Sequence, residues 1–397
     1  MSGWEWRPIG DLVETVQSWS PLREEPDETF QYIDLSAIDQ DEKAIVGARE
    51  VACYEAPSRA RQLVEPNDVL VSTVRPNLNG VARVPAELNG ATASTGFCVL
   101  RPVADALHSS YVFHWVKSPQ FIADMVKKAT GASYPAVSDR IVLASQIPHP
   151  PLQEQRRIAA ILDQADALRT KRRETLAQLD SLTQAIFIEM FGDPTTNPQR
   201  WPRMMLGELV ASGPQNGLYK PATDYGSGTP ILRIDSFYDG IVTKLDSLKR
   251  VRLSESEKNL YGLSANDIII NRVNSREYLG KSAVIPKLAE PIVFESNLMR
   301  LVVERELAEP EYVIQFLQTS FIKDQISAAA KDAVNQSSIN QRDVKGFLIN
   351  VPPLALQQKF IRRVATVAKL SNACRISQLR FNALFASLQN RAFRGEL

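Results

Sequence analysis

The chain of 397 residues repeats itself once, and this repeat constrains its architecture most. Three segments recur in the same order: Gly10–Val13 as Gly207–Val210, Pro66–Leu70 as Ala265–Ile269, and Ile147–Leu152 as Ile349–Leu354. The offset grows from 197 to 199 to 202 residues, so the two halves differ by short loop insertions. A period of this length indicates a duplicated domain and excludes a solenoid of short repeats.

Each half begins with a mixed segment, residues 1–152 and 192–354. Short β-branched runs such as Val69–Val74 and Asp267–Val273 alternate with glycine, proline and asparagine, which is typical of strands and turns. Apolar helical patches occur around 111–125 and 312–326. We therefore predict an α+β fold with two tandem mixed α/β domains.

Each half ends with a long helical segment, residues 153–191 and 355–397. These segments contain no proline, and their one glycine is Gly395. At 1.5 Å per residue each helix is roughly 60 Å long. Their apolar residues follow heptad spacing. The predicted packing positions are Ile158, Ile161, Leu162, Ala165, Leu168, Leu179, Leu182 and Ile186 in the first helix, and Phe360, Val364, Val367, Leu370, Cys374, Phe381, Leu384 and Leu388 in the second.

A single exposed helix of this length cannot cover its own apolar stripe, so we predict that the two helices pair as a coiled coil. The alternative is that each stripe belongs to a separate core, but the shared register across the duplication favours pairing. Antiparallel pairing is a further inference, because the intervening domain can return the chain in either direction. Pro150-Pro151 and Pro352-Pro353 mark the helix entries, and Gly192 ends the first helix.

Sequence motifs for catalysis are missing. The chain contains no GxxxxGK[ST] phosphate loop, no GxGxxG after a strand, no GxSxG elbow and no HxE…PCxxC pattern. Asn350–Leu354 matches the base-holding loop of adenine methyltransferases in neither spacing nor aromatic content. The three histidines, His108, His114 and His149, lack metal-ligand spacing. We therefore expect no chemistry, metal or cofactor in this chain alone.

The three cysteines, Cys53, Cys98 and Cys374, are too few and too far apart for a disulfide framework, which favours a reducing cytoplasm. The first 12 residues do not form a signal peptide. No apolar stretch reaches the roughly 18 residues that a membrane helix needs. The expected location is cytoplasmic, without a membrane partner.

Several strings resemble a known family. Pro150-Pro151-Leu152-Gln153-Glu154-Gln155-Arg156-Arg157-Ile158-Ala159, followed by Ile161-Leu162-Asp163, is similar to the start of the conserved helix in specificity (S, HsdS) subunits of type I restriction–modification systems. Phe187–Pro194 and Ala392–Leu397 resemble the ends of those helices, and Thr95–Pro102 resembles a core strand. The resemblance covers the whole chain. The second half departs from it at Ala355-Leu356-Gln357 and at Ser296-Asn297-Leu298.

The resemblance implies a non-catalytic specificity subunit. Target-recognition domains at 1–152 and 192–354 would each read one half of a bipartite, asymmetric DNA site. Helices 153–191 and 355–397 would form an antiparallel coiled coil that sets the spacer between the half-sites. The implied partners are double-stranded DNA, two methyltransferase (M) subunits and restriction motor-nuclease (R) subunits. S-adenosylmethionine, ATP and magnesium would belong to those partner subunits.

Candidate DNA-contacting residues follow from residue type. Arg and Lys suit guanine, Asn and Gln suit adenine, and two polar loops occupy corresponding places in each half. The candidates are Arg75, Asn77, Asn79, Ser133 and Tyr134 in the first domain, and Tyr219, Lys220, Arg272, Asn274, Arg276, Tyr278, Lys281, Asn335, Gln336 and Asn340 in the second. The alternative is that these are solvated hairpin tips. The basic run 169–173 faces either spacer phosphates or solvent, paired with Asp166 and Glu174.

The charge balance at first argues against a nucleic-acid binder, because 46 basic and 45 acidic residues leave a net charge of +1. That balance is uneven along the chain. Residues 355–397 carry a net charge of +7, residues 153–191 are neutral, and the remainder is acidic. We therefore expect weak DNA binding by the isolated chain. Two rival functions are a two-domain scaffold that binds proteins, and a nuclease or methyltransferase with a diverged site.

Overall fold

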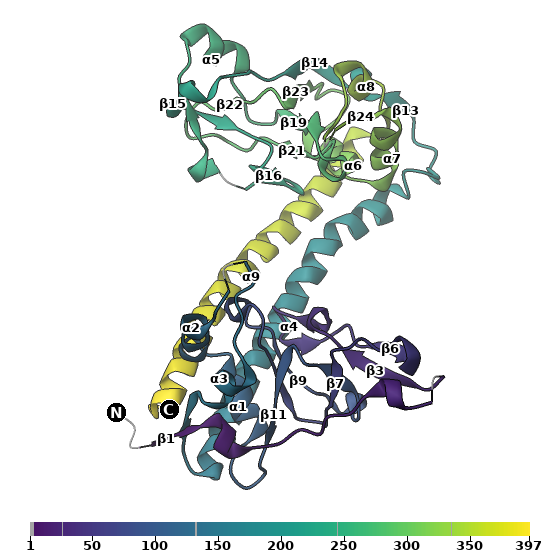
Figure 1. Ribbon diagram of the computed structural model, residues 1–397. Coiled ribbons are helices and arrows are strands. Elements are labelled where there is room, and N and C mark those ends of the chain that lie inside the picture. Colours follow the sequence, from purple (N-terminus) through teal and green to yellow (C-terminus); the bar gives the residue numbers. More distant parts are fainter. Residues whose placement is uncertain (1–3, 26, 132, 244, 335) are drawn as a thin grey trace. The chain divides into compact units, whose positions relative to one another are not determined.

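The computed structural model describes residues 4–25, 27–131, 133–243, 245–334 and 336–397. The chain forms two compact units, each built from one α+β domain and part of both long helices (Figure 1). Unit 1 comprises Met1–Leu176 and Cys374–Leu397, and unit 2 comprises Ala177–Ala373. This division differs from a partition into separate domains and helices, because each long helix contributes to both units.

Unit 1 contains two four-stranded sheets. The first has the order β2-β11-β8-β9, with strands Val13–Glu14, Phe97–Pro102, Val69–Ser72 and Val81–Arg83. The second has the order β6-β3-β10-β7, with strands Arg49–Ala52, Thr29–Ile33, Thr92–Ser94 and Ala60–Leu63. Shorter pairs join β1 (Glu5–Pro8) to β12 (Gln146–His149), and β4 (Ile38–Asp39) to β5 (Ala44–Ile45). The helices are α1 (Ser109–Val116), α2 (Pro119–Lys128) and α3 (Asp139–Leu143).

Unit 2 contains a six-stranded sheet of order β14-β23-β19-β21-β17-β16, with strands Val210–Asn216, Leu298–Val303, Ile268–Asn271, Ser282–Val284, Gly240–Val242 and Phe237–Tyr238. The order β18-β15-β22 joins Arg250–Val251, Tyr225–Leu232 and Val293–Phe294, and β20-β25-β24 joins Val273–Asn274, Gln336–Ser338 and Lys331–Ala333. Strand β13 (Arg203–Met205) pairs with β26 (Leu348–Asn350). The helices are α5 (Glu255–Tyr261), α6 (Pro310–Leu317), α7 (Ser320–Ala329) and α8 (Gln341–Lys345).

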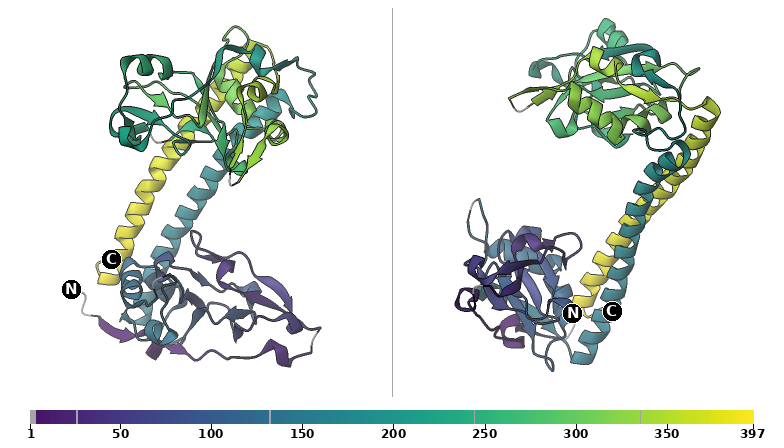
Figure 2. Two further views of the ribbon diagram at one scale, coloured as in Figure 1. Left: turned by 45° about the horizontal axis from the view of Figure 1, so that its top comes forward. Right: turned by 90° about the vertical axis from the view of Figure 1, so that its right-hand side faces the viewer.

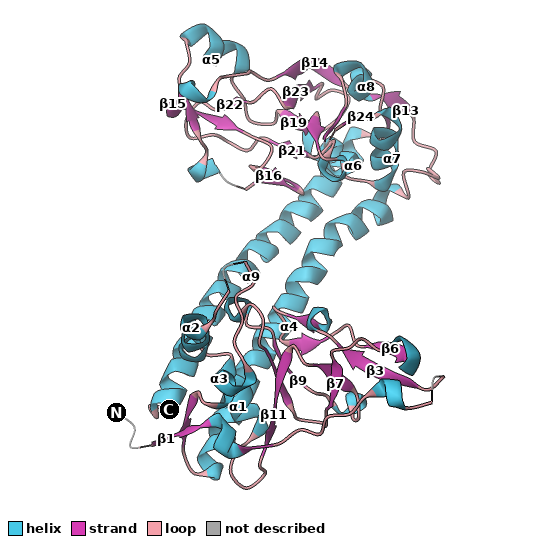
Figure 3. Ribbon diagram, viewed as in Figure 1, coloured by secondary structure: helices cyan, strands magenta, loops and turns pink. Residues whose placement is uncertain are grey.

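The duplication is visible in the topology. The order β2-β11-β8-β9 in unit 1 recurs as β14-β23-β19-β21 in unit 2. The parallel pair of β3 and β10 recurs as β15 and β22, and the closing antiparallel pair of β1 and β12 recurs as β13 and β26. Figure 3 shows that the strands gather in two domains. The predicted tandem α+β architecture is confirmed.

The two long helices are α4 (Leu152–Phe191) and α9 (Leu354–Arg394), close to the predicted bounds. In unit 1, Arg157 and Arg169 of α4 bond the carbonyl of Leu397 and the amide of Asn382. In unit 2, Glu189 of α4 accepts bonds from Arg363 of α9. Within unit 1, residue numbers rise along α4 as they fall along α9, so the helices run antiparallel side by side, as expected (Figure 2).

Burial along the helices agrees with only part of the predicted stripe. Ile158, Leu162, Ile186, Phe360 and Val367 are buried. Ile161, Ala165, Leu179, Val364, Cys374, Phe381 and Leu388 are half-buried. The prediction is wrong for Leu168, Leu182, Leu370 and Leu384, whose exposed fractions range from 39% to 62%. The five buried positions belong to the hydrophobic core of one unit or the other, whereas these four leucines belong to neither core.

Candidate nucleic-acid interface and helix joints

The two polar loops predicted in the first domain lie side by side. A bridge joins Val74 to Ala136, and the Arg75 amide donates to the Pro135 carbonyl at 2.7 Å. The Arg75 guanidinium lies 4.8 Å from the centroid of the Tyr134 ring. Tyr134 is 68% exposed, so the two loops present a stacked cation and aromatic ring to solvent.

The remaining candidates of this domain separate into two groups. Asn77 and Ser133 are exposed on the same loops as Arg75 and Tyr134. Asn79 is buried, and its Nδ2 donates to the Val116 carbonyl at 2.8 Å. Its amide therefore fastens the loop to α1 and is not presented at the surface.

The corresponding loop of the second domain, residues 272–281, leads from β19 to β21. The Arg276 guanidinium pairs with Asp332 at 2.5 Å. The Lys281 ammonium lies 3.9 Å from the centroid of the Tyr238 ring and donates to the Ile234 carbonyl. The Tyr278 side chain, within the same loop, is 41% exposed. Arg276 and Lys281 thus support the loop, and Tyr278 is presented to solvent.

Three further candidates bond to backbone. Arg272 Nη1 donates to the Ser296 carbonyl at 3.1 Å, and Asn274 Oδ1 accepts from the Ser275 amide. Asn340 caps α8, where its Oδ1 accepts from the Arg342 and Asp343 amides. Gln336 is exposed on β25. Asn335 lies outside the described residues.

The last two candidates line a cavity of about 420 Å³ in the second domain. The Tyr219 side chain is 80% exposed, whereas the Lys220 ammonium pairs with Glu257 at 2.7 Å. Lys249 and Asn297 line the same cavity, although they lie outside the loops from which the candidates were taken. A signal was available for Asn297, because it stands where the first half has Gly96.

A buried glutamine and a buried tyrosine join each domain to its helix. Gln155 accepts from the His108 amide at 2.9 Å and donates to the Pro150 carbonyl at 3.0 Å. Gln357, at the matching position, accepts from the Glu309 amide at 2.9 Å and donates to the Pro352 carbonyl at 2.7 Å. The hydroxyls of Tyr111 and Tyr312 donate to the carbonyls of Pro148 and Asn350. The same backbone bonds thus fix both helix entries.

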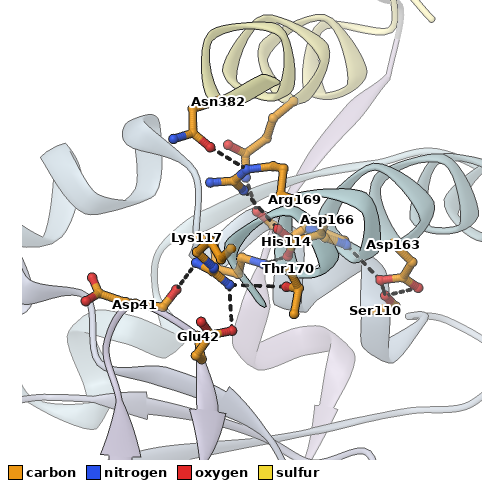
Figure 4. Close-up of polar contacts among 12 residues, drawn as sticks. Asp41, Glu42, Ser110, His114, Lys117, Asp163, Asp166, Arg169, Thr170 and Asn382 are labelled. Carbon is orange, nitrogen blue, oxygen red and sulfur yellow. Dashed lines mark hydrogen bonds and ion pairs between the residues drawn. The ribbon is translucent and has the colours of Figure 1, made fainter. Parts of the chain in front are cut away.

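In unit 1, a polar cluster strengthens this joint between α1 and α4 (Figure 4). His114 is fully buried, and its Nε2 lies 2.8 Å from Asp163 Oδ1. Ser110 Oγ donates to the same carboxylate at 2.6 Å. The Lys117 ammonium pairs with Asp166 at 2.5 Å. Ser110 and His114 both bind to Asp163, so His114 does not act on the serine hydroxyl as the base of a catalytic triad does.

The environment sets the protonation of this cluster. Burial lowers the pKa of His114, although the hydrogen bond to Asp163 opposes this effect. Burial also opposes ionisation of Asp163, but the hydrogen bonds from His114 and Ser110 outweigh it and lower the pKa of Asp163 to about 2. The joint therefore contains a neutral imidazole and a carboxylate near neutral pH.

The basic run 169–173 on α4 is engaged within unit 1. Arg169 pairs with Asp166 at 2.8 Å and lies 4.4 Å from the centroid of the Phe385 ring. Arg173 pairs with Glu42 at 2.6 Å. These contacts favour the structural interpretation of the run over contact with spacer phosphates.

A model of the family described as "Type I restriction modification DNA specificity domain" matches residues 1–179 and again residues 198–379. The chain belongs to this family. Both copies of the specificity domain include one α+β domain and part of the following helix, so the family match follows the duplication.

Relatives of this specificity protein carry consistent names. It is 27% identical to the type I restriction enzyme EcoKI specificity subunit of Escherichia coli over 85% of this chain and 76% of that one. A solved chain from a study of complex assembly and conformational transition of the type I R-M system has 26% identity and a TM-score of 0.64, covering 100% and 99% of the two chains. The S subunit from M. genitalium, at 14% identity over 99% and 97% of the two chains, shares the fold with a TM-score of 0.55.

Across residues 4–397, apart from the four internal positions that the structure does not describe, no three His, Cys, Asp or Glu side chains gather as a metal site. No helix in the same described part of the chain is long and apolar enough to cross a membrane.

Proposed function

We propose that this chain is the DNA-recognition subunit of a type I restriction–modification complex, and that each recognition domain reads one half of a bipartite, asymmetric site. The observation that carries the proposal is the duplicated joint. Two α+β domains with the same topology are each fixed to a long helix by a buried glutamine and tyrosine. Duplicated readers whose loops differ in sequence suit a site with two different halves.

The helix pair sets the spacer between the half-sites in this proposal. Helices of 40 and 41 residues are stiff rods of roughly 60 Å, and a rigid frame converts protein length into a distance along DNA. Two weak readers on one frame also gain affinity through effective concentration. Inserting one heptad into both helices should therefore lengthen the recognised spacer.

The exposed leucines of the helix pair are the proposed docking surface for two methyltransferase subunits. In unit 1, Leu168 and Leu384 flank the bond between Arg169 and Asn382, so they lie at the same level of the antiparallel pair. In unit 2, Leu182 precedes Glu189 by seven residues and Leu370 follows Arg363 by seven, which again places the two leucines at one level. Each unit thus carries one apolar pair suited to a partner helix.

The chain supplies recognition and no chemistry in this proposal. Methyl transfer with S-adenosylmethionine belongs to the methyltransferase partners. ATP- and magnesium-dependent translocation and cleavage belong to the restriction motor-nuclease subunits. Because these partners share the contact with DNA, the subunit itself needs no basic excess.

The test of recognition uses the chain reconstituted with its methyltransferase partners. Duplexes selected from a random library should contain one bipartite motif, and affinity should fall steeply as salt rises. Exchanging residues 1–152 for the matching domain of another family member should change one half-site only. Equal binding to all duplexes, or a change in both half-sites, contradicts the proposal.

The test of docking uses charged substitutions in one unit at a time. Leu168→Glu with Leu384→Glu should remove one methyltransferase subunit from the complex, and Leu182→Glu with Leu370→Glu should remove the other, as measured by mass photometry. Leu22→Glu is the matched control, because Leu22 is 55% exposed outside the helices. Full assembly of both double variants argues against this surface.

A further inference from the structure

The cavity beside Tyr219 combines unpaired polar side chains with aromatic rings. We call this cavity the Tyr219 pocket, and its lining includes Tyr219, Tyr225, Lys249 and Asn297. Within the described residues, the side chains of Tyr219, Lys249 and Asn297 form no hydrogen bond or ion pair with the protein. An open cavity with free aromatic, amide and ammonium groups is suited to an external polar ligand.

The other charges of the lining are already neutralised. Lys220 pairs with Glu257 at 2.7 Å, and Arg233 pairs with Glu295 at 3.0 Å. Glu295 is buried and also accepts from the Ile234 amide at 2.8 Å. Lys249 is therefore the cation of the lining that can pair with a bound anion.

The backbone explains why these residues converge. Strands β15 and β22 are parallel, so their carboxyl ends lie at the same edge of the sheet. Arg233 follows β15, and Glu295, Ser296 and Asn297 follow β22. Lys249 directly precedes β18, which pairs with β15. The Lys249 carbonyl accepts from the Ile231 amide, so Lys249 lies beside the carboxyl end of β15. The residues of the pocket are therefore positioned by paired strands.

In the first domain, an apolar side chain occupies the position that corresponds to the Tyr219 pocket. Asn297 and Gly96 are structural equivalents, because their carbonyls accept from the Arg272 and Thr73 amides at 2.9 Å in the two domains. A Cβ atom on Gly96 would lie 3.0 Å from Leu35 Cδ1, so an apolar side chain covers this position in the first domain. The pocket therefore distinguishes the two readers, as a feature that determines one half-site should.

We propose that the Tyr219 pocket binds one base pair of the second half-site and its adjoining phosphate. This inference rests on the proposed function. The Asn297 amide reads an adenine edge, for which its donor and acceptor are matched. The Tyr219 ring packs against the same base pair, and the Lys249 ammonium contacts the phosphate. Asn297 is then a specificity-determining residue of the second domain.

The experiment measures binding of the reconstituted complex to its selected duplex and to every single base-pair substitution in both half-sites. Asn297→Ala should weaken binding to the selected duplex by about 5- to 150-fold and abolish the base preference at one position of the second half-site. Preferences in the first half-site should remain, which also shows that the complex is folded. Asn259→Ala, an exposed asparagine of α5, is the matched control and should change nothing.

Lys249→Ala should behave differently. Binding should weaken by a similar factor for all duplexes, and the slope of log affinity against log salt should fall by about 1. Lys287→Ala is its control, because Lys287 is exposed outside the pocket. The inference is overturned if Asn297→Ala leaves the base preferences unchanged or weakens binding equally at every position. In that case the proposed function still stands, provided that the wild-type complex is sequence-selective. A wild-type complex without any sequence preference overturns the proposed function itself.

Discussion

The joint of unit 1 and the joint of unit 2 share their backbone bonds but differ in the side chains around them. Unit 1 surrounds its joint with His114, Lys117, Asp163 and Asp166. The matching positions in unit 2 are Gln315, Gln318, Ala365 and Ala368. Aromatic rings pack in both joints. Tyr111, Trp115 and Phe393 of unit 1 correspond to Tyr312, Phe316 and Phe191 of unit 2, where Phe187 and Phe360 enlarge the cluster.

The two joints thus share an aromatic core, to which unit 1 adds a polar cluster and unit 2 adds two further rings. Partly buried ionic groups lose hydration on folding, so their net contribution depends on protonation and on complete pairing. An aromatic cluster depends on buried area and packing, which pH does not alter. The two units should therefore respond differently to truncation and to acid, although they arose from one repeat.

The largest expected effect is in the aromatic joint. Phe360 is 1% exposed, and its ring centroid lies 5.3 Å from that of Phe191. Phe360→Ala should lower the free energy of unfolding of unit 2 by about 3–5 kcal/mol, because it removes buried area and leaves a cavity. Urea unfolding followed by the fluorescence of Trp201 measures this loss, since Trp201 donates to the Phe191 carbonyl.

The matched change in unit 1 is Ile158→Ala, at the position equivalent to Phe360. The four other tryptophans, Trp4, Trp6, Trp19 and Trp115, belong to unit 1, so Trp201→Phe makes the fluorescence specific to that unit. Ile158→Ala should shift the unit 1 transition seen in the Trp201→Phe background, whereas the transition that Trp201 adds when it is present should stay at the same urea concentration. A Phe360→Ala protein that unfolds at the wild-type urea concentration contradicts the aromatic account of the joint.

An intermediate effect is expected from the feature that the two joints share. Gln155→Ala and Gln357→Ala each leave buried backbone groups without partners, which costs about 1–3 kcal/mol. Each variant should destabilise its own unit, and by similar amounts, because the bonds correspond one to one. Gln153→Ala is the control, because Gln153 is exposed and should stay within about 0.5 kcal/mol of wild type. Strongly unequal losses argue against an equivalent role.

The sequence predicted the parts that depend on periodicity. The repeat, the two α+β domains and the bounds of α4 and α9 follow from local patterns. Heptad spacing could not separate buried Ile186 from exposed Leu182, because it does not reveal which helix face a domain covers. Residue type could not separate exposed Asn77 from buried Asn79, whose direction is set by the left-handed backbone at the end of the turn.

Contacts between distant residues were beyond such patterns. His114 and Asp163 are 49 residues apart, and neither belongs to a motif that predicts the bond. Gln155 was visible in the family string, but its partners lie in the loop before α1 and in the residues that lead into α4. Asn297 became a candidate only when the parallel strands placed it beside Tyr219 and Lys249.

The smallest expected effect separates the joints by pH. All three histidines belong to unit 1, and burial lowers the pKa of His114 and of His108 in the folded state. Below about pH 6.5 these histidines therefore bind protons in the unfolded chain but remain neutral in the folded unit. The stability of unit 1 should fall as the pH drops below about 6.5. One proton is worth at most about 1.4 kcal/mol per pH unit, which makes this a small change.

His114→Gln tests the source of this pH effect, because glutamine is the residue at the matching position of unit 2 and can still donate to Asp163. In the Trp201→Phe background, urea unfolding at pH 7.5 and pH 5.5 should show a smaller loss of stability for the variant than for the parent. The loss of stability that remains in the His114→Gln variant should come from His108. Unit 2 contains no histidine, so the Trp201 transition of the wild-type chain should shift little between these pH values. An equal shift in both units, or an undiminished shift in His114→Gln, removes the polar joint as the cause.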